Sequence, residues 1–120
     1  MIGFIHKYIM ILEIELDDLV SDIELLMEKY RKRNESEEIT DYVFLENLAV
    51  LKNQICGLSS LRKIVEEIDE SAYGAVDEFV DDISGRFRAR IEECDLSPSI
   101  FQMVKRKLEK VKTYVLKVDD

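Results

Sequence analysis

The sequence has 120 residues, the size of one domain, and 47% of them are hydrophobic while 36% are charged. One proline and four glycines leave little sequence for turns and exclude collagen-like, low-complexity and disordered classes. The formal net charge of −9 disfavours nucleic acid and anionic membrane surfaces as partners. We therefore expect a single globular domain over residues 1–120 that binds neither of them.

The first predicted element is a long helix over Ile2–Arg33. Its apolar side chains recur at alternating steps of three and four residues, which is the spacing of a buried helix seam. They are Ile5, Ile9, Leu12, Leu16, Leu19, Ile23, Leu26 and Tyr30. Cations in the last turns suit the negative end of the helix dipole, and the polar, acidic stretch that follows predicts a short loop.

The second predicted helix covers Thr40–Asp69. Its apolar seam slips by one residue midway, because Arg62 occupies a position that a strict repeat would fill with an apolar residue. Gly57, Ser59 and Ser60 cluster at the slip, where a kink or break would turn four helices into five. We expect the helix to be continuous there, and the sequence leaves the alternative open.

Two shorter helices complete the pattern. Ser71 and Gly74 supply a cap and a stop before a third helix, whose apolar seam runs over residues 76–94. Ser97 followed by Pro98 is the clearest boundary, because a serine cap with proline at the first helical position favours a helix start. Short connections force neighbouring helices to run antiparallel. The sequence therefore predicts an all-α fold, an antiparallel up-down four-helix bundle with a long first helix.

Charge is distributed unevenly along the chain. The segment 97–120 carries more cations than acids, whereas the segments before it are acidic. We expect the cations of the last helix to pair with acids of the neighbouring helices rather than with a nucleic acid.

No membrane span or secretory leader is predicted. The most apolar run, residues 1–16, is interrupted by charged side chains and falls short of the roughly 20 apolar residues that a spanning helix needs. It also lacks the order of cations, apolar core and small residues that marks a signal peptide. Cys56 and Cys94 stand singly among apolar residues, as reduced core cysteines do. We expect a cytoplasmic protein.

Nucleophilic and zinc chemistry lack the residues that they need. His6 is the only histidine and has neither cysteine near it in sequence, which disfavours Ser-His-Asp and Cys-His devices. Neither the Cys and His ligands of a structural zinc site nor the Glu-x-x-His pairs of di-iron bundles occur. The sequence also lacks a glycine-rich phosphate loop. We therefore expect no catalytic residues and no cofactor of these classes.

Carboxylates offer a metal-binding alternative in the acidic cluster 66–82, around the turn between the second and third helices. Glu67 and Glu70, and likewise Glu78 and Asp81, are three residues apart, which places each pair on one helix face suited to Mg²⁺. This spacing is similar to that of the all-helical nucleoside-triphosphate pyrophosphohydrolases, over this short stretch alone. The resemblance implies a Mg²⁺-dependent nucleotide pyrophosphohydrolase. The simpler interpretation is a solvated acidic surface.

The N-terminal helix carries the main functional signal. Apolar side chains surround most sides of its first four turns, whereas its second half has acids on the outer face. We expect the N-terminal half to project beyond its neighbours and to expose an apolar patch of the kind that marks association. The alternative is that the second or fourth helix absorbs the excess. The residues predicted to bind a partner are Phe4, Ile5, Tyr8, Met10, Ile11 and Ile14.

The preferred function is a non-enzymatic protein-interaction module, either an adaptor or a small helical chaperone. It would form a homodimer or bind a partner helix through the N-terminal helix, while the acidic surface supplies orientation and solubility. The alternative is the Mg²⁺-dependent enzyme built on the acidic cluster.

Overall fold

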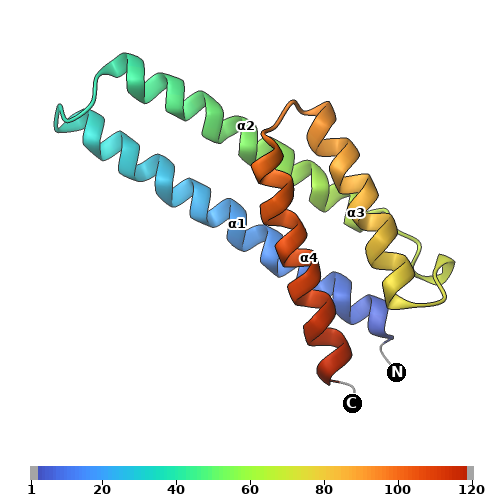
Figure 1. Ribbon diagram of the computed structural model, residues 1–120. Coiled ribbons are helices and arrows are strands. Elements are labelled where there is room, and N and C mark those ends of the chain that lie inside the picture. Colours follow the sequence, from blue (N-terminus) through green and yellow to red (C-terminus); the bar gives the residue numbers. More distant parts are fainter. Residues whose placement is uncertain (1–2, 119–120) are drawn as a thin grey trace.

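The computed structural model describes residues 3–118. They form four α-helices, with one short 3₁₀ helix, η1, between the second and the third. The bounds are α1 (Phe4–Glu35), α2 (Asp41–Glu66), η1 (Glu70–Ala72), α3 (Val76–Glu93) and α4 (Pro98–Val118). Consecutive helices run antiparallel and α4 also packs against α1 (Figure 1), so the predicted all-α, up-down fold with a long first helix is confirmed. The predicted helix start at Ile2 lies outside the described residues.

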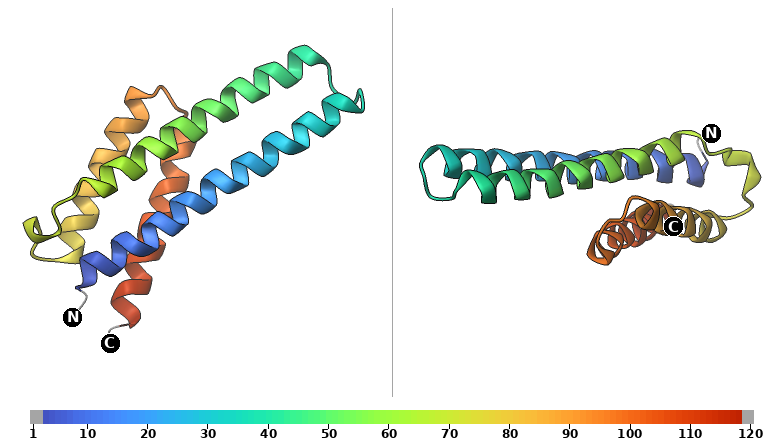
Figure 2. Two further views of the ribbon diagram at one scale, coloured as in Figure 1. Left: turned by 180° about the vertical axis from the view of Figure 1, so that it is seen from behind. Right: turned by 90° about the horizontal axis from the view of Figure 1, so that it is seen from above.

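Two helical hairpins of unequal length form two layers (Figure 2). The long hairpin consists of α1, with 32 residues, and α2, with 26. The short hairpin of α3 and α4 packs across one face of its base, and α4 crosses obliquely over α1 (Figure 1). The end of the long hairpin that carries the α1–α2 loop extends beyond the short hairpin, which makes the molecule elongated, with extents of 55 × 28 × 20 Å.

The loop that joins α1 to α2 is closed by local hydrogen bonds. Glu37 has a φ of 62°, in the left-handed region that ends a helix. The side-chain amide of Asn34 donates to the Asp41 carboxylate at 2.8 Å. The Thr40 hydroxyl caps α2 by accepting a 3.2 Å hydrogen bond from the Val43 amide. Polar residues of the predicted loop thus set the tight turn at the end of the long hairpin.

The second helix runs through Gly57 without a break, as expected. Gly57 is buried beneath Leu96, from the connection between α3 and α4, and a Cβ added there would overlap the Leu96 side chain. Ser60 keeps its hydroxyl satisfied by donating to the Gly57 carbonyl at 2.7 Å. The glycine therefore serves a close approach between the two hairpins rather than a kink.

α2 ends at Glu66, before the predicted end at Asp69. The Asp69 carboxylate instead accepts a 3.0 Å hydrogen bond from the Ser71 amide and caps η1. Hydrogen bonds from the Ser71 hydroxyl and amide lower the pKa of Asp69. Tyr73, just after η1, packs edge-on against Phe79 with ring centroids 5.1 Å apart. The sequence pattern predicted a helix up to Asp69, but this part of the acidic cluster lies in the connection between α2 and α3.

The hydrophobic core lies between the two layers at the base of the long hairpin. Tyr8 and Phe79 are fully buried and pack edge to face, with ring centroids 5.4 Å apart. The predicted seam of α1 is buried from Ile9 to Ile23, but Leu26 beyond it is 40% exposed. Among positions 3–117, no polar or charged residue is buried.

Ion pairs connect the basic α4 to the acidic helices beside it, which confirms the predicted complementarity. Lys107 and Lys110 lie 3.0 and 3.1 Å from the two carboxylate oxygens of Glu15 in α1. Lys112 lies 2.9 Å from Asp77 in α3. Hydrogen bonds from the two lysines lower the pKa of Glu15, and the bond to Asp77 raises the pKa of Lys112.

Both cysteines are free thiols. Cys94 is half-buried, but Cys56 is exposed, so the prediction of a core cysteine is wrong at that position. The reason is that its neighbours Gly57 and Leu58 face the core, which turns Cys56 outward. Of the helices described, none combines the length and the apolar character required to cross a bilayer.

Candidate functional site

The structure divides the predicted N-terminal binding residues into three groups by their exposure. Phe4, Met10 and Ile14 are exposed, with Ile14 at 61%. Ile5 and Ile11 are half-buried and pack against the core. The last predicted residue, Tyr8, is fully buried and forms no part of the surface.

Tyr8 belongs to the contact between the two hairpins. Its hydroxyl donates a 2.7 Å hydrogen bond to the backbone carbonyl of Leu108 in α4. Burial of the phenol is the main reason that its pKa is raised well above the ordinary value. A tyrosine with a satisfied hydroxyl and a buried ring stabilises the fold, so its assignment to a partner surface is wrong.

The four acids of the alternative metal site are not brought together. Glu67 caps the end of α2, and Glu70 lies in η1 with its carboxylate 2.7 Å from His6 Nδ1. Glu78 accepts a backbone hydrogen bond at the start of α3, and Asp81 is exposed one turn further on. Within residues 3–118, no group of three or more potential metal ligands converges.

Neighbouring acids of the same cluster are held by bonds within the fold. Asp82 accepts a hydrogen bond from the Tyr73 hydroxyl and lies 3.1 Å from Arg86, while Asp77 pairs with Lys112 of α4. The bond to Asp82 raises the pKa of Tyr73. These contacts fix the connection between α2 and α3 and tie α3 to α4.

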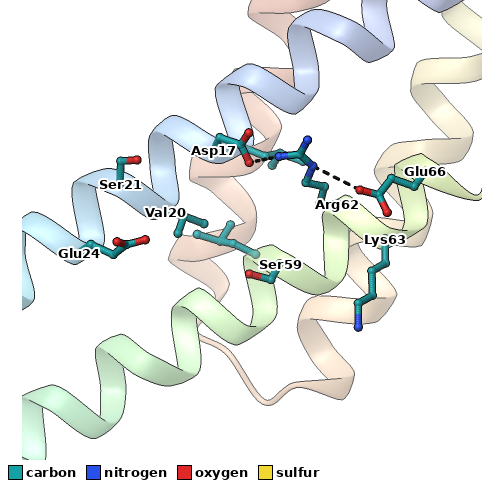
Figure 3. A pocket seen from close by; sticks show the side chains of 10 residues that line it. Asp17, Val20, Ser21, Glu24, Ser59, Arg62, Lys63 and Glu66 are labelled. Carbon is teal, nitrogen blue, oxygen red and sulfur yellow. Dashed lines mark hydrogen bonds and ion pairs between the residues drawn. The ribbon is translucent and has the colours of Figure 1, made fainter.

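A shallow groove of about 470 Å³ runs between α1 and α2 (Figure 3). Arg62 projects into it and pairs with Asp17, and its guanidinium lies 3.5 Å from both Glu13 and Glu66. The hydrogen bond to Asp17 raises the pKa of Arg62. Carboxylates already surround the Arg62 guanidinium, so this side chain serves the contact between α1 and α2.

A seven-residue repeat on α1 runs from the covered base of the long hairpin to its uncovered end and consists of Tyr8, Glu15, Asp22 and Lys29. Its first two members contact α4, since Tyr8 bonds to Leu108 and Glu15 pairs with two lysines. Its next two members, Asp22 and Lys29, lie on the same line of the helix and are exposed. The line that α4 covers therefore continues past the short hairpin.

Two further repeats show the same interruption of packing. Leu12 and Leu19 are buried on α1, whereas Leu26, the next member, is 40% exposed. On α2, Val50 and Val43 stand seven and fourteen residues before Gly57, which is covered by Leu96, and Val50 is 53% exposed. We call this apolar surface the open face and define it by the exposed Leu26, Val43 and Val50 together with the half-buried Tyr30 beside Leu26.

The sequence pattern contained a signal for the open face. Leu26 and Tyr30 extend the predicted seam of the first helix, and the first two predicted helices are longer than the last two. Two short helices cannot cover the full length of two long ones, so one end of the long hairpin must remain uncovered. The expectation that the N-terminal half of α1 overhangs is wrong, because the overhang lies at the opposite end of α1 (Figure 2).

No protein-family model, curated protein or solved structure matches this chain.

Proposed function

We propose that the protein is a non-enzymatic interaction module of the adaptor type, which binds another helical protein surface through the open face. The observation that carries the proposal is the interruption of packing halfway along the long hairpin. The same residue repeats are covered at its base and exposed at its end, with Leu26 and Val50 in the exposed part. An apolar helical surface that continues a packed one is complementary to a further helical layer.

Burial of the open face supplies a driving force for association. A fully exposed Leu or Val side chain gains about 1.5–3 kcal/mol when it is fully buried. Leu26 and Val50 are each about half exposed, so each would contribute about 1 kcal/mol to binding. Stable binding therefore needs several such residues to be buried together, and Tyr30 and Val43 extend the same surface.

The exposed N-terminal residues support association less directly. Met10 and Ile14 are four residues apart and share one side of α1, while Phe4 lies on another side. We assign binding first to the open face and propose Phe4, Met10 and Ile14 as a second contact surface. The compartment proposed for the module is the cytoplasm, where an exposed thiol such as that of Cys56 stays reduced.

The Mg²⁺-dependent alternative has less support. Glu67, Glu70, Glu78 and Asp81 are spread over a helix end, a connection and a third helix, and Glu70 faces His6. A divalent-metal site needs several oxygen ligands that converge on one point. The described side chains offer no such convergence.

The proposal is tested by a photo-crosslinking residue placed at Val50 and, as a control, at Lys52. Both positions are exposed, and Lys52 projects from nearly the opposite side of α2. The purified chains are irradiated in an extract of the cells that produce the protein, and the adducts are identified by mass spectrometry. We expect a discrete adduct at position 50 that is absent at position 52 and is lost when Leu26→Lys is added. The absence of an adduct at position 50, or an adduct insensitive to Leu26→Lys, would overturn the proposal.

A further inference from the structure

Charged and apolar side chains follow one another in a fixed order along the side of α1 that borders the open face. Two acids come first, two leucines lie in the middle, and two cations come last. We call this set the α1 strip, and its members are Asp18, Asp22, Leu25, Leu26, Lys29 and Arg33. Spacings of three and four residues on either side of the adjacent leucines keep the charges on one side of the helix, and all six residues are exposed, Leu25 at 64%.

The four charges of the α1 strip have no ion-pair partner among residues 3–118. Neighbouring charges on the same helix do not stabilise them either. Asp18 and Asp22 are four residues apart, as are Lys29 and Arg33, so each charge has a like charge as its neighbour on the helix. Some other charges of α1 do find partners, since Arg31 pairs with Glu28 and Glu35, and Glu15 pairs with two lysines of α4. The strip is therefore left electrostatically unmatched within the chain.

Read from its C-terminal end, the α1 strip has the same order of charged and apolar residues, but the sign of each charge is reversed. A second copy of α1, laid antiparallel about a twofold axis between Leu25 and Leu26, brings Asp22 opposite Lys29 of that copy and Asp18 opposite Arg33 of that copy. Each contact occurs twice, as a twofold interface requires. Resting on the proposed function, we infer that the partner of the open face is a second copy of this chain, joined through antiparallel α1 strips.

An exposed apolar side chain of α2 lies at the same level of the long hairpin. Asn34 bonds to Asp41 near the end of the hairpin, and Arg62 pairs with Asp17 nearer the base, which sets the register of α2 against α1. In this register Val50 lies level with the centre of the α1 strip. Leu25 and Leu26 thus lie at the twofold axis and the charges flank them, which is the arrangement of an interface with an apolar centre and a polar rim.

The size of the surface indicates a reversible dimer. The α1 strip, from Asp18 to Arg33, is about 22 Å long, and two helices side by side are about 20 Å wide. The contact would bury about 500 Å² on each copy, near the lower limit for specific interfaces. Association is therefore expected to depend on concentration.

The test measures solution mass by sedimentation over a range of concentrations, for the wild type and for charge variants. The wild type should approach twice the 14.1 kDa of one chain. Asp22→Lys alone and Lys29→Asp alone should each raise the dimer dissociation constant about tenfold, because each makes two symmetric contacts repulsive. Both side chains are exposed and without an ion pair, so helicity should be unchanged. Glu24→Lys, an exposed acid on a different side of α1, is the control for net charge and should leave the mass unchanged.

Mixing the two single variants gives the decisive observation. The Asp22→Lys chain carries cations at both positions and the Lys29→Asp chain carries acids at both, so they should pair with each other at wild-type affinity. A wild type that stays monomeric, a mass insensitive to Asp22→Lys, or single variants that do not pair would each overturn this inference. If the wild type is monomeric while the crosslink at position 50 to another protein persists, the proposed function stands and the second copy is excluded. If the wild type is monomeric and no adduct forms at position 50, both proposals are overturned.

Discussion

The hydroxyl of Tyr8 donates a 2.7 Å hydrogen bond to the backbone carbonyl of Leu108, which joins two residues 100 positions apart. Tyr8 and Leu108 are both buried, and the tyrosine ring packs against Phe79 of α3. One side chain of α1 therefore contacts both helices of the short hairpin. This contact fixes where the short hairpin crosses the long one.

Tyr8→Phe keeps the ring packing and removes the bond to Leu108. The expected loss is about 1 kcal/mol of unfolding free energy, the net value of a buried hydrogen bond. Urea denaturation followed by circular dichroism measures the change. Tyr114→Phe is the matched control, because Tyr114 is 56% exposed and should change stability by no more than about 0.5 kcal/mol. Equal effects of the two variants would show that the Tyr8 hydroxyl contributes nothing.

Glu15→Gln should lower stability at neutral pH and have little effect in acid. The lysines of α4 lower the pKa of Glu15 below 4.5, so its contribution is complete above that value and disappears as pH falls through the lowered pKa. Because these ion pairs are partly exposed, the expected loss at pH 7 is about 1 kcal/mol or less. Denaturation at pH 7 and at about pH 2.5 checks it. A difference from wild type that is the same at both pH values would contradict this account.

Gly57→Ala tests the close approach of the two hairpins. Alanine is favoured over glycine in a helix by about 1 kcal/mol, but its Cβ would displace Leu96. We expect the two effects nearly to cancel. In a Leu96→Ala background the displacement is absent, so the same substitution should become stabilising. A double-mutant cycle measures this coupling, and additive free energies would show that Leu96 does not restrict position 57.

Ile11→Glu and Ile14→Glu should differ sharply although they lie one turn apart. Ile11 is half-buried and packs against the core, so a carboxylate placed there should cost about 2 kcal/mol. Ile14 is exposed, and its substitution should leave both stability and solution mass close to wild type. Thermal unfolding and sedimentation check the pair. A drop in mass with Ile14→Glu would move the main contact to the N-terminal surface.

The four helices could be predicted from local signals. Thr40 caps α2, Ser97 and Pro98 start α4, and helical spacing of apolar residues marks each seam. The end of α2 was predicted less well. Asp69 can continue a helix or cap the next turn, and its bond to Ser71 made the second outcome the stable one.

The position of the uncovered surface required information that periodicity does not contain. The first turns of α1 are apolar on most sides because they contact two neighbours at once, α2 within the layer and the short hairpin above it. Ile5, Tyr8 and Ile11 therefore face protein, although their excess over a single seam had suggested exposure. The narrower apolar stripe near Leu26 marks the part of α1 that has one neighbour.

The unequal hairpins also make the backbone unequally protected. Amides at the base of α1 and α2 are covered by two layers, whereas those on either side of the α1–α2 loop are supported by one neighbouring helix (Figure 2). Local opening should therefore need less free energy near the loop, and amide hydrogens there should exchange faster than those at the base. A partner bound to the open face would slow exchange at this end alone. Binding at the open face would then be detected as a local gain in rigidity near the α1–α2 loop, even where the fold itself does not change.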